Sequence, residues 1–408
     1  GTLTNPQNWR IIWGGIDTLL DHNTYTMGPW VINAGASLLS AGSTITTLSG
    51  ENPLITIGEG GAFAQNASEL IMTVTGGSGR VLGIPTTYSF GGTGGMRMNF
   101  ISGNDTMPGF TWAGSGANMF HFHNGGATKN SSVYLDGPVV IKDTMHVDNE
   151  SSTPTRFYQF FTRGHPITAT DFSWGAEGNQ DITVHIDTST MRVGSYNEHL
   201  TTHGGGKEII LMGSSVWYDS SNWTCHDHLL DSLGFGTFKI YFVSDRKSKI
   251  DMGLKFHYDM EMAKSVAGTV CSTVVRARDS LNNLTLTSGK WKGNNYTSIV
   301  GSYINNLSAI GDTALWAVRK NIAQDFTLGA DAHEVCDTNV FVGSIQSDIT
   351  TNGIPVRRMI LRKNKTAVWN MMDNATIHHV LQDSGILVQN KKVLTDSVLV
   401  IRDSLNTD

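Results

Sequence analysis

Between Trp30 and Gly76 the sequence consists of short β-rich pieces separated by small turn residues. Each apolar cluster is about as long as a strand, and Gly, Ser, Asn or Pro lies in nearly every gap. No apolar stripe with helical periodicity runs through the segment. Three successive clusters would make a coil of roughly 25 residues, which is within the range of solenoid repeats. We therefore predict that this segment begins a β-solenoid, in the form of a right-handed parallel β-helix.

The composition also favours an all-β fold. Only 16% of the 408 residues are charged and 45 are Gly, which suits an architecture with many turns. The net charge of −6 and the absence of a basic run argue against a nucleic-acid partner. No apolar run approaches the roughly 20 residues that span a bilayer, so we expect no membrane insertion. Three scattered cysteines are expected to be buried free thiols: Cys225, Cys271 and Cys336.

The strand pattern divides the chain into three expected segments. Residues 1–130 form a β-solenoid-like domain, and residues 131–310 form a β-rich central domain of either a sandwich or further coils. Residues 311–408 are expected to contain a short helix at Thr313–Gln324, where apolar residues recur at helical spacing, and a C-terminal β-sandwich module.

The clearest alternation in the sequence lies between Ile250 and Met262. Apolar and polar or small residues alternate over this whole stretch, which is typical of a strand buried on one face. An exposed turn joins it to Thr237–Val243, and the pair predicts an antiparallel hairpin. The predicted fold is thus all-β, with a parallel β-helix at the N-terminus followed by antiparallel β-sandwich elements.

One stretch carries a resemblance to a known family. The residues Asn352-Gly353-Ile354-Pro355-Val356-Arg357-Arg358, followed by Ile360-Leu361-Arg362, resemble the NG-x-PV-x-R stretch of small β-sandwich modules on phage virion proteins. Together with the solenoid-like start and the low charge, they make the whole chain similar to a bacteriophage tail fibre or tailspike. The resemblance implies a homotrimer on the virion surface that contacts other tail proteins and binds a host surface glycan or protein receptor. Some proteins of this type also cleave glycans, so the resemblance includes a possible glycan-cleaving activity.

Asp259 and Glu261 are the candidate catalytic pair. On a strand they project to one face, with Cα atoms about 6.5–7 Å apart. Carboxylates roughly 6.5–9.5 Å apart can act as acid and base in inverting glycoside hydrolysis. The simpler interpretation is the solvated face of an amphipathic strand. A polysaccharide hydrolase or lyase on a β-helix is one alternative function, and a structural virion or extracellular-filament protein without a ligand is another.

Five aromatic residues lie among Gly, Ser or Asn, as loop residues do. Sugars stack on such rings, and neighbouring polar groups bond their hydroxyls. The alternative is that each ring fills a domain junction. The candidate glycan-binding residues are Trp112, Trp174, Trp217, Tyr218 and Trp223.

His121 and His123 alternate with Phe120 and Phe122. On a strand both imidazoles point the same way and can bind a metal ion. The resemblance to phage fibres adds that such a pair on a trimer axis would supply six nitrogens. The alternative is a strand with Phe packed inward and His outward. A metal ion at His121 and His123 is the only cofactor that the sequence suggests.

Overall fold

The structure is a computed structural model that describes residues 2–4, 11–19, 24–27, 29–41, 44–47, 54–66, 69–85, 88–112, 120–124, 130–149, 157–176, 180–198, 208–224, 238–251, 259–273, 280–281, 283–293, 298–299, 302–307, 312–316, 325–332, 334–336, 338–343, 346–363, 366–402 and 404–406. All regular elements among these residues are β-strands. None of the described residues forms a helix long and apolar enough to span a membrane. The all-β class is therefore confirmed.

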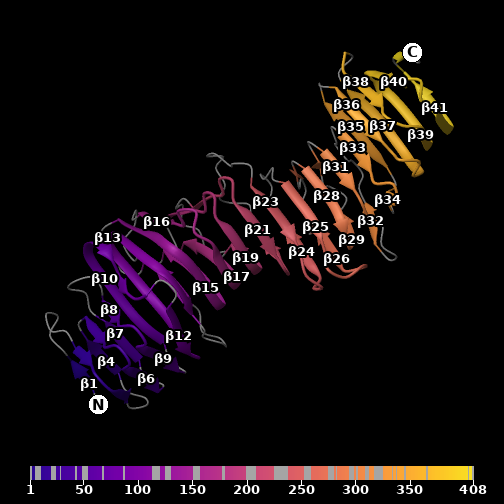
Figure 1. Cartoon of the computed structure of the whole chain (residues 1–408). Helices are drawn as coiled ribbons and strands as arrows, with labels where there is room; N and C mark the ends of the chain where they lie inside the picture. Colours follow the sequence, from indigo (N-terminus) through magenta and orange to yellow (C-terminus); the bar gives the residue numbers. More distant parts are fainter. Residues whose placement is uncertain are drawn as a thin grey trace. The chain divides into compact units, whose positions relative to one another are not determined.

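The described residues form two compact units, one up to Trp217 and one from Tyr218 onward. Within each unit, parallel strands stack coil upon coil, as a β-solenoid does (Figure 1). The predicted parallel solenoid at the N-terminus is confirmed. The expected division into three segments stays a prediction.

In the first unit the main sheet is built from strands of three to 19 residues. They are β1 (Thr2–Thr4), β3 (Ile16–Leu19), β4 (Thr24–Met27), β6 (Ser37–Ala41), β7 (Thr44–Thr47), β9 (Ala62–Asn66), β10 (Glu69–Arg80), β12 (Tyr88–Gly92), β13 (Gly95–Trp112), β14 (Phe120–His123), β15 (Ser131–Asn149), β16 (Phe157–Phe161), β17 (Ile167–Ala176), β18 (Asp181–His185), β19 (Thr190–Glu198), β20 (Glu208–Leu211) and β21 (Val216–Asp219), whose last two residues belong to the second unit. A separate four-stranded sheet contains β2 (Ile11–Trp13), β5 (Trp30–Ile32), β8 (Ile55–Ile57) and β11 (Leu82–Gly83).

The second unit continues the same kind of sheet. Its strands are β22 (Trp223–Thr224), β23 (Lys239–Phe242), β24 (Ser248–Asp251), β25 (Asp259–Ala263), β26 (Val270–Thr273), β28 (Asn283–Ser288), β29 (Lys290–Gly293), β31 (Ser302–Asn305), β32 (Thr313–Trp316), β33 (Asp325–Leu328), β34 (Glu334–Cys336), β36 (Ser347–Thr350), β38 (Val368–Met371), β40 (Ile386–Val388) and β42 (Ser404–Asn406). The unit also contains two smaller sheets: β27 (Ser280–Leu281) with β30 (Ser298–Ile299), and β35 (Asn339–Gly343), β37 (Val356–Lys363), β39 (Ala375–Ser384) and β41 (Leu394–Ile401).

The strand register sets the coil length. Met96 pairs with Phe120, and Phe120 pairs in turn with Met145 on the following coil. In the second unit Asp259 pairs with Asn283 in the same way. The separations of these partners along the sequence agree with the predicted coil of roughly 25 residues.

Inward side chains at equivalent register positions stack to fill the solenoid. One such stack is fully buried and consists of Met96, Phe120, Met145, Phe172 and Tyr196. Burying each large apolar side chain contributes about 1.5–3 kcal/mol. Because every coil covers the apolar face of the one before it, stability comes from contacts between neighbouring coils.

Cys271 also lies in the core as a free thiol, as predicted. Burial raises the pKa of this thiol to about 11, so it stays protonated at neutral pH. Cys225 and the side chain of Cys336 lie outside the described part of the chain.

The predicted antiparallel hairpin is wrong. Lys239–Phe242 pairs in parallel with β25, and β24 pairs in parallel with β26. Alternation of apolar and polar residues marks a strand with one buried face, and a solenoid strand has one buried face whichever way its neighbours run. Residues 252–258 lie outside the described residues. Residues 131–310 were expected to form either a sandwich or further coils. The strand pairings described there are parallel, as in further coils.

The predicted helix at Thr313–Gln324 is also wrong where the structure describes it. Residues 313–316 form β32, which pairs in parallel with β29 and β34. In a solenoid, the hydrogen bonds between strands of neighbouring coils override a short helical pattern of apolar residues. Residues 317–324 lie outside the described part of the chain.

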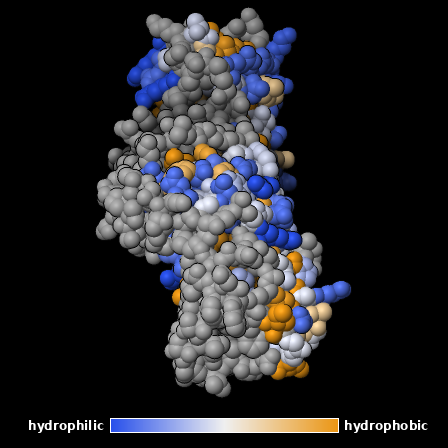
Figure 2. All heavy atoms as spheres, turned by 90° about the vertical axis from the view of Figure 1, so that its left-hand side faces the viewer, coloured by the Kyte–Doolittle hydropathy of each residue, from blue (hydrophilic) through white to orange (hydrophobic). Residues whose placement is uncertain are grey.

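The C-terminal strands expected from the sequence are present, and β35, β37, β39 and β41 form the additional small sheet, paired in parallel. Asn352 and Gly353 make the turn before β37 with positive φ angles of 48° and 77°. Asn352 Nδ2 donates a hydrogen bond to Leu328 O over 2.6 Å. Among the described residues β41 pairs only with β39, and it exposes Val398 and Val400. Figure 2 shows similar hydrophobic groups scattered among hydrophilic atoms on one face of the molecule.

Candidate functional sites

Outward side chains of the second unit line up across β21, β23, β25 and β28. Tyr218 and Tyr241 stack with ring centroids 5.1 Å apart and an angle of 13° between the rings. Lys239 Nζ lies 4.4 Å from the centroid of Tyr241, where a cation is attracted to the ring face. All three side chains are half-buried, so each keeps contact with solvent. We call this set the polar–aromatic ladder; its members are Tyr218, Lys239, Tyr241, Asp259, Glu261 and Asn283.

The two predicted catalytic carboxylates belong to this ladder. Asp259 and Glu261 alternate with buried Met260 and Met262, so they share the outer face of β25 as expected. Glu261 Oε2 lies 2.7 Å from Lys239 Nζ. Each carboxylate also accepts a hydrogen bond from the next coil: Thr287 Oγ1 donates to Glu261 over 2.9 Å, and Asn283 Nδ2 donates to Asp259 over 2.7 Å. Their catalytic role stays a prediction.

Lys239 is held as a cation in this ladder. Partial burial acts to lower the pKa of its ammonium group, but the hydrogen bonds to Glu261 and Tyr241 outweigh it and raise the pKa above its ordinary value. The ladder therefore offers ring edges, one fixed positive charge and two carboxylates side by side. Such a mixture of apolar and hydrogen-bonding groups suits the two faces of a sugar ring.

The four tryptophans predicted to bind sugars are core residues. Trp112, Trp174 and Trp217 are fully buried, and Trp223 is 1% exposed. Trp174 Nε1 donates to Tyr196 Oη over 2.7 Å, inside the core. A buried ring cannot stack on a sugar, so the prediction is wrong for all four. Strand alternation explains the outcome, because Trp217 faces inward while its neighbour Tyr218 faces outward.

A second set of outward side chains lies in the first unit, on β14, β15 and β17. Phe120 and Phe122 fill the core, so His121 and His123 project from the opposite face of β14, as the simpler sequence interpretation had it. Unlike the polar–aromatic ladder, this set is covered, because every one of its members is buried. We call it the histidine–aspartate cluster; its members are His121, His123, His146, Asp148 and Ser173.

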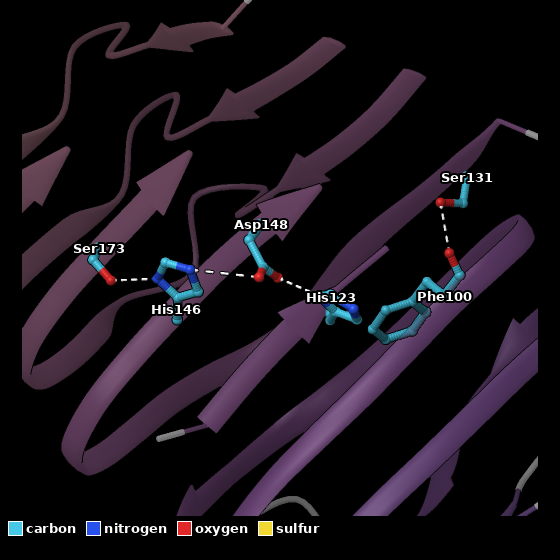
Figure 3. Close-up of polar contacts among 6 residues, drawn as sticks. All are labelled: Phe100, His123, Ser131, His146, Asp148 and Ser173. Atoms are coloured by element: carbon cyan, nitrogen blue, oxygen red, sulfur yellow. Dashed lines mark hydrogen bonds and ion pairs between the residues drawn. The ribbon is translucent and has the colours of Figure 1, made fainter. Parts of the chain in front are cut away.

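Asp148 is at the centre of this cluster (Figure 3). Its Oδ1 lies 2.8 Å from His123 Nδ1, and its Oδ2 lies 3.5 Å from His146 Nε2. The other nitrogen of His146, Nδ1, is hydrogen-bonded to Ser173 Oγ. The ring centroids of His121 and His146 are 5.1 Å apart. One carboxylate thus links two imidazoles, and one of these reaches a serine hydroxyl.

Burial and the contacts between members together set the ionisation of the cluster. Burial alone would raise the pKa of Asp148, but the hydrogen bond with His123 and the nearby imidazole of His146 outweigh it and hold the pKa well below its usual range. Burial lowers the pKa of His121 to about 4, although the charge of Asp148 acts in the opposite direction. At neutral pH, Asp148 is therefore a carboxylate and His121 is uncharged.

The described residues contain no group of three or more His, Cys, Asp or Glu side chains arranged to hold a metal ion. His121 and His123 share a face, as the metal prediction required, but His123 Nδ1 is engaged with Asp148. Metal binding by this pair stays a prediction.

The sequence reasoning found the two histidines of β14 but missed the rest of the cluster. A signal was present. Residues 145–149 (MHVDN) repeat the pattern of residues 120–124 (FHFHN) one coil later. Aligning the two coils places His146 beside His121 and Asp148 beside His123, which is the observed register. Ser173 follows from the next coil, opposite His146.

Comparisons with known proteins give no relative: no family model, no curated protein and no solved structure matches this chain.

Proposed function

We propose that the protein is a surface component of the bacteriophage tail fibre or tailspike type, which recognises a host surface glycan through the polar–aromatic ladder. A β-solenoid is compatible with such a protein. The observation that carries the proposal is the stacked pair Tyr218 and Tyr241 beside Lys239 and Glu261, since rings and charged groups lie side by side on a solvent-accessible face. The proposal includes a homotrimer on the virion surface, attached to other tail proteins.

The rigidity of the ladder supports this role. Salt bridges or hydrogen bonds to a neighbouring strand hold four of its polar groups, so these lose little side-chain freedom when a ligand binds; the four are Lys239, Asp259, Glu261 and Asn283. Tyrosine offers a large contact area with few rotatable bonds, and it is enriched at binding hot spots. A glycan bound here would contact the edges of the two tyrosine rings and exchange hydrogen bonds with the charged groups.

The test is binding of the full chain to a panel of bacterial capsular and lipopolysaccharide glycans. We expect at least one glycan to bind, and Tyr241→Ala to weaken that binding about 10-fold or more. Arg358→Ala is the matched control, because Arg358 is exposed in the same unit but lies outside the ladder. Equal binding by both variants, or no glycan bound by the wild type, would contradict the proposal.

Glycan cleavage is the second candidate, and the shared face of Asp259 and Glu261 favours it. An inverting hydrolase needs one carboxylic acid and one carboxylate around a water molecule. If this function is present, incubation with the bound glycan releases new reducing ends, and Asp259→Asn or Glu261→Gln abolishes their release while binding persists. Binding without new chain ends would leave recognition as the function and remove cleavage.

A further inference from the structure

The histidine–aspartate cluster holds a serine, an imidazole and a carboxylate in a continuous row. Ser173 Oγ bonds to His146 Nδ1, and His146 Nε2 faces Asp148 Oδ2 at 3.5 Å. Such a constellation is recognised by geometry and roles rather than by its order in the sequence. We propose that Ser173, His146 and Asp148 form a hydrolytic site for short-chain carboxylic esters, with Ser173 as the nucleophile.

Each member has a defined role in this site. His146 accepts the serine proton at Nδ1, which requires the tautomer with hydrogen on Nε2, directed at Asp148. Compared with the serine-protease arrangement the imidazole is turned round, since the serine meets Nδ1 and the carboxylate meets Nε2. The 3.5 Å contact is long, as such contacts often are without substrate. His123 fixes the other oxygen of Asp148 at 2.8 Å and so orients the carboxylate.

The serine end of this buried row lies next to a solvent-exposed residue on the following coil. Asp148 is 3% exposed and Ser173 is 8% exposed, while Asn197, which pairs with Ser173 on β19, is exposed to solvent. A substrate therefore approaches from the side of Asn197, whose amide can donate a hydrogen bond to the oxyanion formed at Ser173. The small exposed area of Ser173 favours a short acyl group over a long one.

The reaction uses only the ester and water. Ser173 Oγ bonds to the carbonyl carbon while its proton moves to His146 Nδ1. Collapse of the tetrahedral intermediate breaks the bond to the alcohol oxygen, which takes the proton from His146. A water molecule then gives a proton to His146 and attacks the acyl-serine, and the proton returns to Ser173 Oγ. The products are one carboxylic acid and one alcohol.

The first test is labelling of the full chain with a fluorophosphonate, a reagent that modifies activated serines, followed by peptide mass mapping. We expect a single adduct on Ser173 that is absent in Ser173→Ala and in His146→Ala. Ser195→Ala is the matched control, because Ser195 Oγ donates to the Asp171 carboxylate instead of to an imidazole. This variant should label like the wild type. An unlabelled wild type, or an adduct elsewhere, overturns the proposal without reliance on any variant.

The second test measures hydrolysis of p-nitrophenyl acetate. Ser173→Ala should lower kcat by at least ~100-fold, while Ser195→Ala leaves it unchanged. Asn197→Ala should lower kcat by about 10-fold or more while the fluorophosphonate adduct persists. Release of acetate from an O-acetylated polysaccharide, measured in parallel, separates an ester carried by a glycan from a free ester. Wild-type activity that persists in Ser173→Ala overturns the site.

The ester site lies in the first unit and the polar–aromatic ladder in the second, so either proposal can fail without the other.

Discussion

The histidine–aspartate cluster and the polar–aromatic ladder are built by the same rule but differ in their contact with water. Both consist of outward side chains on neighbouring solenoid strands, brought together by a register that repeats once in every coil. In the cluster, Asp148 and His121 are almost fully buried and their pKa values move far from the ordinary range. In the ladder, Lys239 and Glu261 form an ion pair that solvent still reaches.

Burial is one of the properties that decide what a row of polar side chains can do. Charges in water interact weakly, whereas charges in a covered site interact strongly and must be paired. The ladder therefore suits recognition, where groups must remain available to a ligand. The cluster suits proton transfer, where one imidazole must be held between a carboxylate and a hydroxyl.

The largest expected effect comes from removing the central carboxylate of the cluster. Asp148→Ala should lower the free energy of unfolding by about 3–5 kcal/mol, because it leaves buried imidazoles without their shared acceptor. Glu261→Ala, the counterpart in the ladder, should cost about 0–1 kcal/mol. Urea unfolding followed by tryptophan fluorescence measures both. Similar costs for the two variants would mean that the cluster is more hydrated than its burial indicates.

The next effect is a dependence of stability on pH that belongs to the cluster. The pKa of His121 falls from 6.5 to about 4 on folding, so the unfolded chain binds a proton first as the pH falls. The contribution is fully present above pH 6.5 and is lost as the pH falls toward 4, to a total on the order of 3 kcal/mol. His121→Gln should flatten this part of the stability curve. If the free energy of unfolding changes with pH equally in the wild type and in His121→Gln, the pH dependence belongs to other groups.

The smallest effect is expected from the ion pair of the ladder. Lys239→Met should change the free energy of unfolding by about 0.2–1 kcal/mol, and the difference should shrink in 1 M salt because exposed charges are screened. The cost of Asp148→Ala should stay nearly the same in salt, since a buried pair is screened much less. Unfolding curves at low and high salt test this contrast. The contrast fails if the cost of Lys239→Met is the same at both salt concentrations.

The solenoid was predictable because its signal is local. Apolar clusters of strand length, separated by turn residues between Trp30 and Gly76, predicted the coil length and the strand class. The shared outer face of Asp259 and Glu261 followed from alternation alone. The direction of strand pairing did not follow from the sequence. Alternation shows that a strand has one buried face, but it does not show whether the paired strand runs parallel or antiparallel.

The candidate sites were harder to find because they depend on register between coils. His146 meets Ser173 only when two coils are aligned, and no residue within one coil marks that alignment. Trp174 and Trp217 were misassigned for a related reason. The small polar residues around them resemble loop sequence, yet strand alternation turns both rings into the core.

The register has one more consequence, for the lengths that this chain can adopt. Phe120 pairs with Met96 and with Met145, so deleting residues 120–144 would bring Met145 directly onto Met96. The inner stack would close again with one layer fewer, whereas a deletion of half that length would place polar side chains in the core. Such a protein can become longer or shorter only in steps of one coil, and every step carries a complete row of outward side chains with it.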